Sequence, residues 1–86
     1  MPVLSTFFGI VVRMFHDDHG PPHFHVQYAE YSAVIDMETG RLLAGALPRR
    51  CGALVEEWRN LRVAELRAAW KAAQAGKAPK RIGPLT

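Results

Sequence analysis

The chain has 86 residues, of which 49% are hydrophobic and 22% charged, with a formal net charge of +3. This length and composition favour one globular domain and exclude a disordered chain or a coiled coil. The single cysteine, Cys51, excludes an intrachain disulfide and therefore a disulfide-stapled secreted scaffold.

The apolar N-terminal stretch, residues 1–12, is predicted to begin a β-strand and not a signal peptide. It lacks a basic start and a small-x-small cleavage site, and Arg13 ends it before it could span a bilayer. We therefore expect a cytoplasmic protein. Its first strand is predicted over residues 8–15, which are rich in β-branched and aromatic side chains.

Three further strands follow a turn-rich segment at residues 17–22. Residues 23–28 and 31–37 alternate between apolar and polar side chains, the pattern of half-buried strands. A turn ending at Gly40 leads to a weaker fourth strand over residues 41–47.

From Pro48 the spacing of apolar side chains becomes helical. We expect two helices with a break near Asn60, because one unbroken helix would be too long for so small a domain. The sequence thus predicts an α+β fold: an antiparallel meander of three to four strands followed by two helices packed on one sheet face. Residues 1–76 form the domain, and residues 77–86 are predicted to be a flexible basic tail.

Polar side chains are predicted to gather on the sheet face that the helices leave free. A register with Met14 opposite Val26 brings Asp17 opposite His23, and the turn at residues 29–30 brings Asp36 opposite His23 on the other side. The residues expected on this face are Arg13, Asp17, His23, His25, Gln27, Ser32 and Asp36.

Three interpretations of this polar face remain open. His23 and His25, with His19 and Asp17, form a candidate ligand set for a divalent transition metal such as Zn²⁺, although the spacing is not diagnostic. Alternatively, the candidate catalytic residues are His23, His25, Asp17, Asp36 and Arg13, with histidine as acid or base and Arg13 stabilising an anion. In the third interpretation, imidazole–carboxylate hydrogen bonds only hold the loop at residues 17–22. No cofactor is required by any motif in the sequence.

Charge is distributed unevenly along the chain. Residues 1–40 carry one basic and five acidic side chains, whereas residues 41–86 carry ten basic and three acidic ones. A basic half attracts nucleic-acid phosphates or an acidic protein, although a solvated helix surface has the same composition. The candidate contacts are Arg67, Lys71, Lys77, Lys80 and Arg81.

Several segments together resemble a family of small bacterial proteins, the domain of unknown function 4160. The resemblance covers nearly the whole chain and is most specific in the segment Asp-Asp-His-x-Pro-Pro-His-Phe-His-Val; it rests on residues 7–10, 17–26, 35–40, 47–50 and 57–58. It implies a small partner protein encoded nearby, in an arrangement like that of toxin–antitoxin pairs. It transfers no catalytic residue.

These observations favour a small cytoplasmic interaction protein, toxin-like, that binds a partner protein and for which RNA is a further candidate partner. A metal-binding module that uses the His-x-His strand is the alternative. A homodimer is also an open alternative, because a free strand edge can pair with a second copy of the chain.

Overall fold

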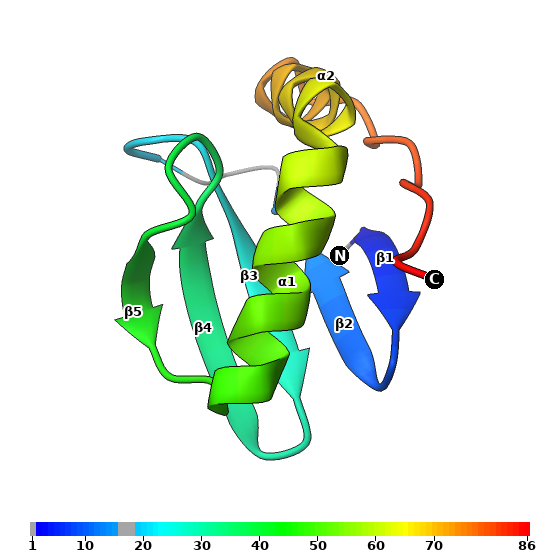
Figure 1. Cartoon of the computed structure of the whole chain (residues 1–86). Helices are drawn as coiled ribbons and strands as arrows, with labels where there is room; N and C mark the ends of the chain where they lie inside the picture. The colour runs from blue at the N-terminus through cyan, green and yellow to red at the C-terminus, as the bar shows by residue number, and fades with distance from the viewer. Residues whose placement is uncertain (1, 16–18) are drawn as a thin grey trace.

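The computed structural model describes residues 2–15 and 19–86, and in them a five-stranded antiparallel sheet is followed by two helices (Figure 1). The strands, which lie in the sheet in chain order, are β1 (Val3–Phe7), β2 (Ile10–Arg13), β3 (His23–Tyr28), β4 (Tyr31–Asp36) and β5 (Leu42–Gly45). The helices are α1 (Arg49–Leu61) and α2 (Val63–Gln74). The predicted α+β class and antiparallel meander are confirmed, but the described sheet has five strands and not three to four.

The additional strand, β1, precedes the predicted first strand, and a tight turn separates it from β2. Phe7 pairs with Ile10, and the two residues between them, Phe8 and Gly9, have φ values of 50° and 80°. Left-handed φ at both central positions matches the twist of a two-residue hairpin. A phenylalanine with a left-handed φ is uncommon. The sequence of the apolar stretch, residues 1–12, therefore did not predict a turn between residues 7 and 10.

The register between β3 and β4 is the predicted one: His23 pairs with Asp36, and His25 with Val34. Between β2 and β3 the predicted register is wrong by two residues, since Val12 and not Met14 lies opposite Val26. A displacement of two residues keeps every side chain on its face, so alternation alone does not distinguish the two registers.

Helix α1 crosses one face of the sheet and buries the core beneath it (Figure 1). The Trp58 ring contacts Phe7 and Phe24 at centroid distances of 5.5 and 5.9 Å. The helix ends near Asn60, as predicted, and Arg62, at φ −121° and ψ 22°, separates α1 from α2. Neither helix of the described chain has the length and apolar character that a bilayer span requires.

The core includes Trp58, Leu66, Phe24 and Val26, which are all buried, with Leu54 and Trp70 partly buried against it. Tyr31 is 40% exposed. It follows directly on the β3–β4 turn, at the end of the sheet.

The C-terminal segment packs against the domain, in contrast to the flexible tail predicted over residues 77–86. Ile82 and Leu85 are buried, and the Ile82 N–H donates to the Leu4 carbonyl of β1 at 2.7 Å. The indole Nε1 of Trp58 donates to the Gly83 carbonyl at 2.8 Å. Two apolar side chains in a basic segment are enough to anchor it when a strand edge offers a carbonyl acceptor.

Candidate functional site

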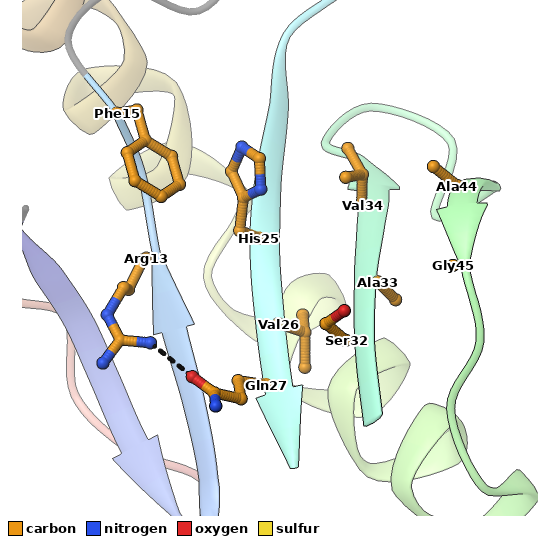
Figure 2. Close-up of a pocket in the computed structure, with 10 residues that line it drawn as sticks. All are labelled: Arg13, Phe15, His25, Val26, Gln27, Ser32, Ala33, Val34, Ala44 and Gly45. Carbon is orange, nitrogen blue, oxygen red and sulfur yellow. Dashed lines mark hydrogen bonds between the residues drawn. The ribbon is translucent and has the colours of Figure 1, made fainter. Parts of the chain in front are cut away.

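A shallow basin of about 280 Å³ lies on the sheet face that α1 does not cover (Figure 2). Strands β2, β3, β4 and β5 all contribute to it, because alternate side chains of neighbouring strands point to the same face. The side chains that give it chemical character are Arg13, Phe15, His25, Gln27 and Ser32. Val34, Ala44 and Gly45 form its smaller, less polar part.

Arg13 and His25 form the centre of this basin. They are direct cross-strand partners between β2 and β3. The Arg13 Nη1 donates to Gln27 Oε1 at 2.9 Å, which orients the guanidinium along the sheet surface. The Phe15 ring meets the His25 ring nearly edge to face, with centroids 4.3 Å apart. A cation, an imidazole, an amide and an aromatic ring are thus held side by side.

His23 lies next to His25 but is buried, in contrast to the open sheet face predicted for it. It is 7% exposed, and its ring lies 5.3 Å from the Trp70 ring of α2 and 5.4 Å from His25. Its Nδ1 donates to the Pro21 carbonyl at 2.8 Å, since a carbonyl only accepts. In the neutral ring this hydrogen bond leaves the lone pair on Nε2. The contact with Trp70 buries His23 because α2 reaches the start of β3.

Asp36 lies opposite His23 in the sheet, as predicted, but its carboxylate stabilises a turn. Oδ1 accepts the backbone N–H groups of Glu38 and Thr39 at 2.8 and 2.9 Å. The hydrogen bond from the Thr39 N–H, with that from Glu38, holds the pKa of Asp36 below its ordinary value. Asp36 therefore shapes the turn at residues 36–40, and its catalytic role stays a prediction.

The remaining predicted ligands are not brought to the His23–His25 pair within the described residues. His19 is exposed in the loop before β3, and Asp17 lies outside the described residues. Across residues 2–15 and 19–86, no group of three or more His, Cys, Asp or Glu side chains has an arrangement that could hold a metal.

Sequence reasoning missed a buried arginine that holds the same turn. Arg59 of α1 is 6% exposed and donates from Nη1 to the carbonyls of Met37 and Glu38, both at 3.2 Å. Its Nε and Nη2 bind the Glu56 carboxylate at 2.8 and 2.7 Å. This ion pair raises the pKa of Arg59 and lowers that of Glu56. The available signal was the position of Arg59 beside Trp58 on the buried face of α1.

Gly40 allows this contact. It has φ +78°, and a Cβ at this position would collide with Glu56 Oε1 and lie 2.8 Å from Arg59 Nε. The turn at residues 36–40 therefore approaches α1 closely enough that a side chain there would displace the ion pair.

The predicted phosphate contacts differ in their surroundings. Arg67 binds Glu38 through two hydrogen bonds, of 3.0 and 2.7 Å, so its charge already has a partner. Lys71 is exposed on α2. Lys77, Lys80 and Arg81 lie together along a hollow between α2 and the C-terminal segment.

Cys51 is not a candidate nucleophile. It is buried in α1 at the edge of a hollow lined by Phe8, Tyr28 and Leu54. Burial raises the pKa of the thiol, which disfavours the nucleophilic thiolate.

Comparison with known proteins places the chain in a family. No curated protein and no solved structure matches it. A family model, "Domain of unknown function (DUF4160)", matches residues 9–71, which include all of β2 to β5 and α1 and most of α2. The match covers most of the chain and includes Arg13, His25 and the turn held by Arg59. The chain therefore belongs to this family.

Proposed function

We propose that this chain is a small cytoplasmic interaction protein of bacteria, the toxin-like member of a two-gene module, that binds a small partner protein and RNA. The observation that carries the RNA-binding part is the basin on the uncovered sheet face. It groups Arg13, His25 and Phe15, three side-chain types that bind phosphates and bases.

Each of these side chains has a distinct role in the proposal. The Arg13 guanidinium, held by Gln27, pairs with a phosphate through two of its N–H donors. Phe15 and His25 offer ring surface to an unstacked base, as sheet-face readers of single-stranded RNA do. Ser32 and Gln27 supply hydrogen bonds at the edges of the basin.

The same arrangement suits RNA cleavage without a metal ion. In this form of the proposal His25 takes the proton of a ribose 2′-hydroxyl, and the 2′ oxygen attacks the adjacent phosphorus. The 5′ oxygen leaves with the proton from Nε2 of protonated His23, whose ring centroid lies 5.4 Å from that of His25, and Arg13 stabilises the additional negative charge.

An RNA-binding measurement with basin variants tests the proposal. Arg13→Ala and His25→Ala should each weaken binding of a single-stranded RNA oligonucleotide by about tenfold, the equivalent of one lost charged or stacking contact. Arg49→Ala, which removes the same charge from an exposed position on α1, is the matched control. Unchanged RNA affinity in both basin variants would contradict the proposal.

The partner-binding part is tested by co-expression with the product of the adjacent gene. The two proteins should elute together from a size-exclusion column, since an inhibitor of a toxin-like protein has to form a stable complex with it. Elution as two separate monomers would contradict it.

A metal-binding module is a second candidate, favoured by the hydrogen bond between His23 and Pro21. Metal-ligating histidines commonly donate one ring N–H to a carbonyl while the other nitrogen binds the ion. In this alternative His23 and His25 bind a divalent ion such as Zn²⁺, with His19 or Asp17 from the adjoining loop.

Metal analysis of protein purified without a polyhistidine tag distinguishes this candidate. It predicts stoichiometric metal that is lost in His23→Ala/His25→Ala. Added Zn²⁺ at 100 times its Kd should raise the free energy of unfolding by about 2.7 kcal/mol. Metal-free protein whose melting temperature does not respond to Zn²⁺ would eliminate it.

A further inference from the structure

The hollow between α2 and the C-terminal segment lies away from the basin on the sheet. Its volume is about 420 Å³. The segment is reversed after α2 at Gly76, which has φ 76°, and the Lys77 N–H donates to the Ala72 carbonyl at 2.9 Å. This is the hydrogen bond of a helix that ends in a left-handed residue. Ile82 and Leu85 then anchor the segment in the core, so its basic side chains have a defined place.

The rim of the hollow is cationic. Lys77, Lys80 and Arg81 all line it. Glu65 is the only acidic side chain at the described hollow, and its charge is paired with Arg62 at 3.1 Å. From residue 66 to the C-terminus the sequence has no acidic residue. The potential at this surface therefore attracts negative charge.

Small apolar side chains also line the hollow, and these are called its alanine floor: Ala68, Ala69, Ala72 and Ala78. The buried Ile82 lines it as well. None of the lining residues is aromatic, so the hollow has no surface on which a base would stack. Short side chains leave room for an apolar side chain of a ligand to enter. A basic rim around an alanine floor is complementary to an acidic peptide with small apolar residues, and less so to a nucleic acid.

We infer that this hollow binds a segment of a protein partner that carries acidic side chains and, between them, an apolar side chain. The inference rests on the proposed function for the existence of that partner and adds the surface and the chemistry of the contact. Acidic side chains of the segment pair with Lys77, Lys80 and Arg81, while an apolar side chain sits on the alanine floor between them.

The test is binding of a labelled helical peptide composed of Glu, Ala and Leu, with the peptide in which Lys replaces Glu as its counterpart. The wild-type chain should bind the acidic peptide and not the basic one. Lys77→Glu/Lys80→Glu should weaken binding by tenfold or more, because two attractive contacts become repulsive. Arg41→Glu/Arg49→Glu changes the net charge equally at exposed positions outside the hollow and should bind nearly as wild type does.

Equal weakening in both double variants would show that net charge alone drives binding and would overturn the inference. Failure of the wild-type chain to bind the acidic peptide would also overturn it. The product of the adjacent gene is measured alongside: if it fails to bind wild type while the peptide binds selectively, the proposed partner is wrong and the docking site stands. If the gene product binds the wild-type chain and binds Lys77→Glu/Lys80→Glu with the same affinity, the inference fails and the proposed partner stands.

Discussion

At the scale of single residues, the turn at residues 36–40 is held from three sides. Asp36 binds its backbone N–H groups, Arg59 binds its carbonyls from α1, and Arg67 binds Glu38 from α2. The turn therefore links the β4–β5 hairpin to both helices. Asp36, a predicted catalytic residue, and Arg67, a predicted phosphate contact, thus both make contacts that hold this turn.

Removal of the Arg59 side chain should strongly destabilise the protein. Arg59→Ala leaves the carbonyls of Met37 and Glu38 without their donor and Glu56 without its ion-pair partner, at an expected cost of about 2–3 kcal/mol. The measurement is urea unfolding followed by circular dichroism. Arg49→Ala, on the same helix but exposed, should change the free energy of unfolding by less than about 0.5 kcal/mol. Equal effects of the two variants would refute the role of Arg59.

Stability should decrease on acidification through the carboxyl groups of this turn. The folded-state pKa of Asp36 lies below its ordinary value of 3.8, so the carboxylate stabilises the folded state at higher pH. That stabilisation is lost as the pH falls through the ordinary pKa of Asp36 and then through the lower pKa that Asp36 has in the folded state. Asp36→Asn should flatten this part of the pH dependence in urea titrations from about pH 6 down to about pH 3. An unchanged slope would show that Asp36 is not responsible.

At the scale of secondary structure elements, loop length decided which registers were predictable. The two-residue loop between β3 and β4 leaves one register in which apolar side chains share a face, and that register was predicted correctly. The loop between β2 and β3 is long, so displacements by two residues satisfy the same pattern. The β1–β2 turn was missed because Phe8 is not a residue type that usually marks a turn.

The β3–β4 turn should be improved by glycine at its first central position. Ala29 has φ 51°, a left-handed value at which a Cβ is strained. Ala29→Gly should stabilise the protein by about 1 kcal/mol, which corresponds to a rise in Tm of roughly 4–8 °C for a chain of this size. Scanning calorimetry measures the shift. Glu30→Gly is the control and should lower Tm, because no positive φ is present at that position.

At the scale of the whole molecule, the C-terminal segment closes the domain at the β1 edge. Leu85→Ala should cost about 3 kcal/mol, since the side chain is buried, whereas Thr86→Ala next to it is exposed and should cost little. Urea unfolding of both variants makes the comparison. If Leu85→Ala unfolded at the wild-type midpoint, the segment would not be part of the cooperative domain.

Part of the candidate site was predictable from the sequence. Alternation along the strands grouped Arg13, His25 and Gln27 on one face, because the period of a strand determines the face of each side chain. The burial of His23 was not predictable, since it depends on where Trp70 of α2 reaches the sheet. The ion pair of Arg59 likewise depends on a contact between residues distant in the sequence.

The central claim, that the basin around Arg13 and His25 binds RNA, is tested most directly by an NMR titration of the labelled full chain with a single-stranded RNA oligonucleotide. Backbone amide shifts should concentrate on β2, β3 and β4 around Arg13, His25 and Ser32, because ligand contacts change the local environment of these strands. Shifts confined to α2 and residues 77–86, or no shifts at all, would contradict the claim.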